Sequence, residues 1–185
     1  MREPEFSLIV AMGDVPPAGK ELHFEADQTT RTRLARRYGI PEITRLAGTA
    51  RIRPYRKEGL TLDCHFEAEL VQNCVVTLDP VTQHIDEEFR QRYLPEHMTG
   101  PEPDAPENDR EITIDVDAED SPEPMKAGKI DIGETVAEQL ALAIDPYPRK
   151  PGVSFDPPSP SKEAGDASES RPNPFAVLEK LKKNS

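Results

Sequence analysis

Arginine is the residue type whose placement most suggests a chemical role in this chain. Residues 31–58 contain nine Lys or Arg but only two Glu, so this segment carries a charge of +7. The whole chain carries −12, and the remainder therefore carries −19. Guanidinium groups bind phosphates, and cellular salt screens charges over roughly 8 Å, so a local basic face can bind RNA even on an acidic protein. The alternative is a solvated face that pairs with the chain's own acidic loop.

Two groups of arginines in this segment have spacings that place them on shared faces. Arg51 and Arg53 are two residues apart, and such residues lie on the same face of a strand. Arg33, Arg36 and Arg37 have the three- and four-residue spacings of neighbours on a helix. The predicted RNA contacts are therefore Arg31, Arg33, Arg36, Arg37, Arg51 and Arg53.

The cysteines form no pattern typical of a metal or catalytic site. Cys64 and Cys74 are too few for a disulfide framework, and Cys64 falls in the buried phase of a predicted strand. Cys74-Val-Val-Thr77 has the frame of a C-x-x-C motif without its second thiolate, whereas structural zinc usually takes four Cys or His ligands. No P-loop, nucleophile elbow or His-Glu-x-x-His motif is present. We predict no catalytic residue, metal, cofactor or small-molecule substrate, and an enzyme is the least favoured interpretation.

Length and composition indicate one domain with extended flanking segments. The 185 residues suffice for one ordinary domain, and 35% are hydrophobic, below the roughly 45–50% of globular chains. The net charge of −12 excludes a uniformly basic nucleic-acid binder, and 5% aromatic residues argue against a broad stacking platform. No apolar run reaches the ~18–20 residues that span a bilayer, and the N-terminus does not read as a signal peptide. We expect a cytoplasmic protein with reduced thiols and no membrane contact.

The first forty residues predict two short strands and a helix. The strands are at 5–12 and 21–26, with loop chemistry between them. The helix is at 31–38, where Asp27 or Thr30 supplies the N-cap and Gly39 ends the helix.

The clearest strand is at 60–70, where apolar and polar residues alternate as on a strand with one buried and one wet face. A turn precedes it, so 43–55 is the predicted hairpin partner, with Pro54 on an edge or at a strand end. Residues 74–78 are predicted as a third strand and 81–89 as a fourth. Together these segments predict an antiparallel β-meander.

The best helix begins at Asp131, which fits an N-cap with Glu134 three residues later, as in a capping box. An apolar stripe follows at a spacing of four residues, and Pro146 ends the helix. Before it, residues 101–126 form an acidic, proline-punctuated loop with one added edge strand at 112–116. The predicted fold class is therefore α+β: an antiparallel β-meander with one main packed helix, an acidic insert and a disordered C-terminal tail.

The chain is predicted to divide into an α+β domain at 1–150, a disordered linker at 151–172 and a short amphipathic helix at 173–185. Eight prolines occur from Pro146 to Pro174 inclusive, and such a composition cannot bury a core. At the end, Phe175, Leu178 and Leu181 share one helical face. A helix of about ten residues is marginal alone, so we predict that these three residues dock on a partner.

Three segments in order resemble the YceD family, the large ribosomal RNA subunit accumulation proteins. Asp131-Ile-Gly-Glu-Thr-Val-Ala-Glu-Gln-Leu, with the exit Asp145-Pro-Tyr-Pro-Arg, resembles the family's acidic helix and its proline-bearing exit. Asn173-Pro-Phe-Ala-Val-Leu, followed by Leu181-Lys-Lys, resembles its C-terminal signature. Cys74-Val-Val-Thr-Leu-Asp-Pro lies where many members have C-x-x-C-Leu-x-Pro. Thr77 departs from that pattern and the exit carries no cysteine, so a metal site of other members is not expected here.

The resemblance covers residues 5–150 and 172–183, and it implies a bacterial, cytoplasmic and non-catalytic protein needed for normal levels of large-subunit (23S) rRNA. We therefore expect a factor in ribosome biogenesis that contacts large-subunit rRNA or a pre-ribosomal particle. The alternative is an acidic adaptor or chaperone that binds a basic ribosomal protein through residues 101–126, without binding RNA directly.

Overall fold

A computed structural model of the chain describes residues 4–99 and 121–154. The chain divides into two units, Met1–Val153 and Ser154–Ser185, and the description that follows concerns the first. Several predicted segments lie outside the described residues: the edge strand at 112–116, the acidic loop up to residue 120, the linker from 155 onward and the helix at 173–185.

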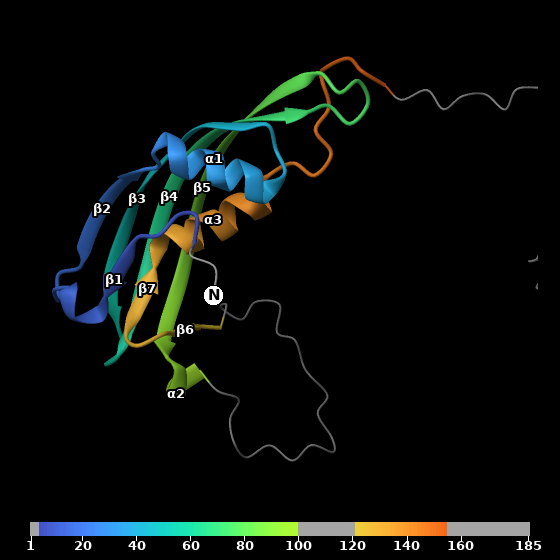
Figure 1. The fold of residues 1–185 in the computed structure, drawn as a ribbon. Helices are drawn as coiled ribbons and strands as arrows, with labels where there is room; N and C mark the ends of the chain where they lie inside the picture. Colours follow the sequence, from blue (N-terminus) through green and yellow to red (C-terminus); the bar gives the residue numbers. More distant parts are fainter. Residues whose placement is uncertain (1–3, 100–120, 155–185) are drawn as a thin grey trace, which may run out of the picture. The chain divides into compact units, whose positions relative to one another are not determined.

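A five-stranded sheet forms the centre of the fold (Figure 1), and it contains the predicted meander strands at 43–55, 60–70 and 81–89. In spatial order the strands are β2 (Lys20–Glu25), β3 (Glu42–Tyr55), β4 (Gly59–Asn73), β5 (Pro80–Pro95) and β6 (Glu123–Met125). The strands from β2 to β5 pair antiparallel with their chain neighbours, whereas β6 pairs in parallel with the end of β5. The α+β class and the meander are confirmed, but residues 123–125 form a strand where the sequence predicts loop.

The position of β4 at the centre of the sheet follows from the alternation of its side chains. The apolar residues of one face are at most 1% exposed: Leu60, Leu62, Cys64, Phe66, Ala68 and Leu70. β4 pairs with β5 in continuous register from Leu60 to Asn73. A slip of one residue would turn the whole apolar set toward solvent, so the alternation fixes the register.

The predicted strand at 74–78 is wrong, because these residues form the turn between β4 and β5. The Leu78 N–H donates to the Cys74 carbonyl at 2.9 Å, which closes the turn. Leu78 has a φ of 64°, in the left-handed region that a strand does not contain. The Val75 N–H donates to the Pro148 carbonyl at 2.9 Å, so this backbone is satisfied by the segment after the last helix instead of a sheet partner.

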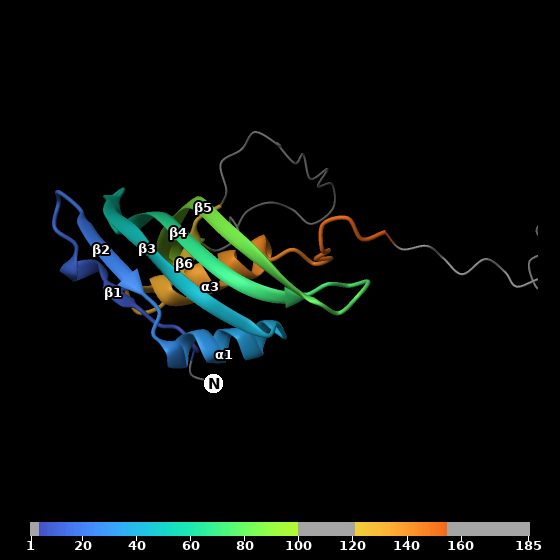
Figure 2. The same cartoon turned by 90° about the horizontal axis from the view of Figure 1, so that it is seen from above.

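Two helices and a two-stranded ribbon cover one face of the sheet (Figures 1 and 2). The helices are α1 (Gln28–Tyr38) and α3 (Ile132–Ala143), and the ribbon consists of β1 (Ile9–Ala11) and β7 (Lys129–Asp131). Two short helices lie elsewhere in the chain: η1 (Met12–Asp14) follows β1, and α2 (Glu96–Thr99) follows β5. Of the predicted stripe in α3, Ile132, Val136 and Leu140 are fully buried, whereas Ile144 is the C-cap and is only partly buried. β1 is shorter than the strand predicted at 5–12, since only three residues pair with β7.

α1 ends at Gly39 as its sequence predicts, but it begins at Gln28, three residues before the predicted start at 31. The Asp27 carboxylate accepts a hydrogen bond from the Thr30 N–H at 2.7 Å, so Asp27, and not Thr30, is the N-cap. This hydrogen bond also lowers the pKa of the Asp27 carboxyl below its ordinary value. Gly39, with a φ of 68°, ends the helix in the left-handed conformation that glycine adopts readily.

Asp131 both caps α3 and fixes the N-terminal segment beside it. Its carboxylate accepts hydrogen bonds from the backbone N–H groups of Gly133 and Glu134, as the capping prediction requires. It also accepts from the Leu8 N–H at 2.8 Å and from the Ser7 hydroxyl at 2.6 Å. One side chain therefore satisfies the start of a helix and positions the segment that leads into β1.

Polar contacts also tie α1 to α3. Arg37 donates to both carboxylate oxygens of Glu134, at 3.0 and 3.1 Å, and to Glu5 at 3.0 Å. These two carboxylates raise the pKa of Arg37 above its ordinary value. The Tyr38 hydroxyl donates to the Ala137 carbonyl at 2.8 Å. The two helices are therefore held to each other as well as to the sheet.

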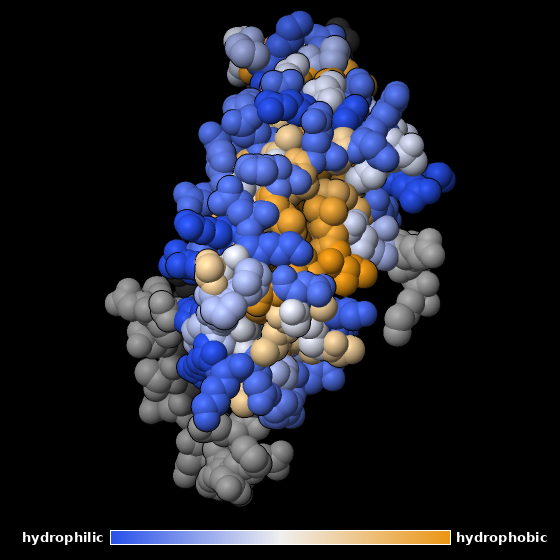
Figure 3. Space-filling model, turned by 90° about the vertical axis from the view of Figure 1, so that its left-hand side faces the viewer, coloured by the Kyte–Doolittle hydropathy of each residue, from blue (hydrophilic) through white to orange (hydrophobic). Residues whose placement is uncertain are grey.

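On the side of the molecule where β2 lies, the five-stranded sheet and the β1–β7 ribbon do not pair with each other. Within the described residues, β2 pairs only with β3 and β1 only with β7. Seen from this side, a strip of apolar side chains lies between polar ones (Figure 3). No helix among the described residues has the length and apolarity needed to cross a bilayer.

Candidate functional site

The second face of the sheet carries no covering layer in the described part of the chain, and its side chains form charged rows across the strands. Cross-strand pairing places Glu21, Arg51, Asp63 and Arg90 in one row from β2 to β5. Arg53 and Arg92 occupy the next row, on either side of Thr61. Residues on one face of neighbouring strands interact directly, so arginines far apart in sequence meet on this exposed face.

Asp63 holds two of these arginines in place. Its carboxylate oxygens each lie 2.5 Å from a guanidinium nitrogen, one of Arg53 and one of Arg90. Partial burial raises the pKa of Asp63, but the hydrogen bonds from Arg90 and Arg53 outweigh it, so the net shift is downward. The arginine side chains remain 47% and 66% exposed. Asp63 therefore orients two guanidinium groups on the exposed face of the sheet.

Tyr55 gathers two further arginines beside this pair. The guanidinium carbons of Arg56 and Arg92 lie 5.1 and 5.7 Å from the centre of its ring, which is cation–π distance. A surface hollow of about 400 Å³ lies between Arg53, Tyr55, Arg90 and Arg92. We call five arginines the basic patch: Arg53, Arg90 and Arg92, which line this hollow, Arg56, which lies over Tyr55, and Arg51, which lines the adjoining depression with Arg53 and Arg90. The patch offers planar guanidinium donors of the kind that bind phosphate oxygens.

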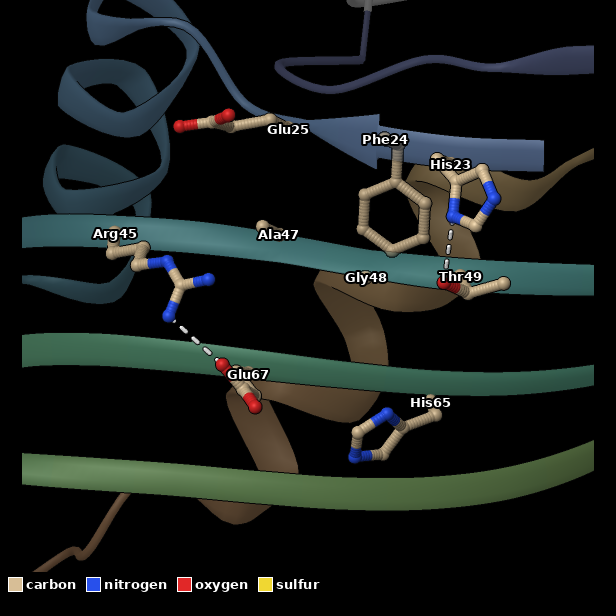
Figure 4. A pocket seen from close by; sticks show the side chains of 9 residues that line it. All are labelled: His23, Phe24, Glu25, Arg45, Ala47, Gly48, Thr49, His65 and Glu67. Atoms are coloured by element: carbon tan, nitrogen blue, oxygen red, sulfur yellow. Dashed lines mark hydrogen bonds and ion pairs between the residues drawn. The ribbon is translucent and has the colours of Figure 1, made fainter.

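A second hollow, of about 420 Å³, lies at the middle of the same face (Figure 4). We call it the central hollow. Its floor is Ala47 and Thr49 of β3, and the rings of His23 and His65 stand on the strands either side. His23 Nδ1 lies 3.0 Å from the Thr49 hydroxyl. Small side chains on β3 between larger ones on β2 and β4 therefore create the depression.

Acidic side chains surround the other end of the central hollow. Glu25 and Glu67 line it, and the Glu67 carboxylate accepts a hydrogen bond from Arg45 at 2.8 Å. His65 Nε2 lies 2.6 Å from a carboxylate oxygen of Asp86 on β5. Between the row of Arg53 and Arg92 and the row of Glu67, the exposed face thus changes from basic to acidic.

The structure separates the predicted RNA contacts into two groups. Arg51 and Arg53 lie in the basic patch, on the exposed face. Arg31, Arg33, Arg36 and Arg37 belong to α1, on the covered side of the sheet (Figure 2). There Arg37 is engaged by Glu134 and Glu5, and Arg31 donates to the Ala26 carbonyl at 2.6 Å. The predicted docking residues Phe175, Leu178 and Leu181 lie outside the described part of the chain.

Sequence reasoning missed Tyr55, Arg90 and Arg92, because it counted charge only within one contiguous segment. A signal for them does exist. Once the turn between β4 and β5 is placed at residues 74–79, counting back along both strands sets Arg90 opposite Asp63. The register of the hairpin therefore contains the information that linear charge counting lacks.

The two cysteines occupy contrasting surroundings. Cys64 lies in the core, where burial raises the pKa of its thiol to about 12. Cys74 lies in the turn after β4, where hydrogen bonds from the Thr77 side chain and from backbone N–H groups, including that of Lys150, lower its pKa to about 6. No cluster of three or more potential ligands for a metal ion occurs within residues 4–99 and 121–154.

Comparison with known protein families identifies the chain. The family described as large ribosomal RNA subunit accumulation protein YceD matches residues 62–182, well over half of the chain. The match includes the segments of Cys74, Asp131 and Asn173 that carry the resemblance in the sequence. The comparison with curated proteins and the comparison with solved structures gave no match. By its family match, this chain belongs to the YceD family, whose name implies a role in the accumulation of large-subunit ribosomal RNA.

Proposed function

We propose that this chain supports the accumulation of large-subunit (23S) rRNA in the bacterial cytoplasm by binding rRNA, free or in a precursor particle, without catalysing a reaction. The basic patch is the observation that carries the proposal. Five arginines from β3, the following turn and β5 lie in two adjoining hollows of an exposed face, with Asp63 as the carboxylate that orients two of them.

Phosphate contact fits the geometry better than a purely structural role for these arginines. The structural alternative is that they balance the chain's own carboxylates, and Asp63 does pair with two of them. Within the described residues, the patch nevertheless gathers five arginines beside three carboxylates, those of Glu21, Asp63 and Glu88, on a chain whose net charge is −12. Each phosphate contact releases condensed counterions, so binding should weaken as salt rises, and the steepness should report the number of contacts.

Charge reversal on the two sides of the sheet tests this proposal. We expect R51E/R53E to weaken binding of a labelled 23S rRNA fragment at least tenfold and to reduce the salt slope by about 1 to 2, as expected when one or two phosphate contacts are lost. The control is R33E/R36E, which makes the same charge change on α1. Filter binding across a salt series and thermal melting would be measured on both variants. Unchanged binding and slope in R51E/R53E would refute the basic patch as the RNA contact.

The acidic balance of the chain favours a second candidate function. Outside residues 31–58 the chain carries −19, which suits an adaptor or chaperone for a basic ribosomal protein. Purification of the tagged full-length protein with and without nuclease distinguishes the two. Retention of a basic ribosomal protein after nuclease treatment, together with no RNA binding by the pure protein, would favour the adaptor.

A further inference from the structure

The central hollow adjoins the basic patch, so one ligand can reach both. Thr49 and His65 line the central hollow, and together with Arg51, Arg53 and Arg90 they also line the depression between it and the patch. From Thr49 to Arg53 is four residues along β3, or about 13 Å at the rise of a strand. A short stretch of extended nucleic-acid backbone covers that distance.

The two hollows differ in charge. The basic patch presents guanidinium groups, whereas the central hollow is lined by the carboxylates of Glu25 and Glu67 and by one guanidinium, that of Arg45, which pairs with Glu67. Because the carboxylates outnumber the guanidinium, a phosphate group is less favoured there than in the basic patch. The Glu25 carboxylate can accept a hydrogen bond from an exocyclic amino group, as acidic side chains do from the N4 amino group of cytosine.

The shape of the central hollow suits a flat ring. Ala47 and Thr49 form a low floor, and the imidazoles of His23 and His65, 77% and 51% exposed, stand at its sides (Figure 4). Bases that leave the helical stack of RNA pack on aromatic side chains, including histidine, and bond through their edges. A base in a duplex is already stacked and paired, and so is not available to the hollow.

We propose that the central hollow binds one unpaired nucleobase that carries an exocyclic amino group, while the basic patch binds the adjoining phosphates. This inference rests on the proposed function and specifies its ligand as single-stranded RNA. It also assigns a preference: adenine and cytosine should bind more tightly than uracil, which lacks an amino group.

The test fills the central hollow without changing any charge. Ala47→Leu raises the floor, and the matched control Thr82→Leu adds the same side chain at the far end of the exposed face, on β5. The probes are fluorescently labelled oligoadenylate, oligocytidylate and oligouridylate, and an RNA duplex of equal length. For the wild-type protein we expect tighter binding of oligoadenylate and oligocytidylate than of oligouridylate and duplex. In Ala47→Leu the ratio of these affinities should fall about tenfold, as expected for the loss of one base contact. The salt dependence of binding should not change, because the phosphate contacts remain.

A second variant keeps the inference testable if Ala47→Leu does not fold. Glu25→Gln alters an exposed side chain on the edge strand β2 and should reduce the preference over oligouridylate. If Ala47→Leu and Glu25→Gln bind all probes as the wild type does while R51E/R53E does not, the base site is refuted and the phosphate site stands. An equal loss in Thr82→Leu would also refute the base site. If R51E/R53E too binds normally, the proposed function itself fails.

Discussion

The two faces of the sheet come from the same strands, yet they have almost nothing in common chemically. On β4, Phe66 is fully buried against the helices, while its neighbour His65 is half exposed and pairs with Asp86. The covered face holds the apolar side chains that stabilise the fold, and the exposed face holds charges and hollows. Period-two alternation lets one sequence specify both, so stability and ligand binding should respond to different substitutions.

Among substitutions that compare the two faces, the largest change in the free energy of unfolding is expected at Phe66. Phe66→Ala should lower the free energy of unfolding by about 3–5 kcal/mol, because it removes a fully buried ring and leaves a cavity. His65→Ala, one residue away, should change it by less than about 0.5 kcal/mol, since the side chain is exposed. Urea unfolding followed by circular dichroism measures both. Similar losses in the two variants would mean that the exposed face also carries much of the stability.

A smaller loss is expected at Asp131, which lies on the covered side. Asp131→Ala should lower the free energy of unfolding by about 2 kcal/mol, because the carboxylate caps α3 and also binds Leu8 and Ser7. Asp27→Ala removes a cap that bonds only within α1 and should cost less. Thermal melting of the two variants gives the comparison. A greater loss for Asp27→Ala would show that the link to the N-terminal segment contributes little. RNA binding should not change in either variant.

The effect that is expected to be smallest at neutral pH is that of the two cysteines, which differ in their pH dependence. Cys64 belongs to the covered face of β4, and Cys74 follows the end of the same strand. The pKa of Cys74 is lowered from 9.0 to about 6, so its contribution to stability is fully present above pH 9 and is lost as pH falls through about 6. For Cys64 the pKa is raised to about 12, and stability is lost as pH rises from 9 toward 12.

Thiolate absorbance at alkaline and acidic pH distinguishes these cases. In Cys64→Ala, the remaining Cys74 should titrate near pH 6, and in Cys74→Ala, the remaining Cys64 should stay protonated past pH 10 while the protein is folded. A Cys74 that titrates near its ordinary pKa would mean that the Thr77 hydroxyl and the nearby backbone N–H groups do not stabilise the thiolate.

The sequence predicts the fold well where one residue type repeats with a clear period or where a cap is local. The alternation at 60–70 predicts β4 and its buried face, and Asp27, Gly39 and Asp131 mark helix ends through contacts a few residues away. The prediction of secondary structure fails where contacts with residues far away in the sequence determine the conformation. Val75 and Val76 have strand-forming side chains, but contacts with Pro148 and Lys150 hold that segment as a turn.

The candidate site shows the same limit. Arg51 and Arg53 were predictable from a two-residue spacing, whereas Arg90 and Arg92 join them only through the register of a hairpin. The three-residue β6 was not predictable, because Glu123–Met125 contains a proline and pairs with β5 across the intervening residues. Local patterns thus identify the strands, and the pairing between strands identifies the site.

The long pairing of β3 with β4 determines which recombinant fragments of this protein can be expected to fold. The family match begins at residue 62, inside β4, whereas β3 pairs with β4 from Glu42 opposite Val71 to Tyr55 opposite Gly59. A recombinant fragment that began at the start of the match would lack β3 and leave one edge of β4 with unpaired backbone groups, a template for aggregation. The residues matched by the family model therefore do not coincide with a folding unit of this chain. Expression fragments should retain the strands and the helix that precede residue 62.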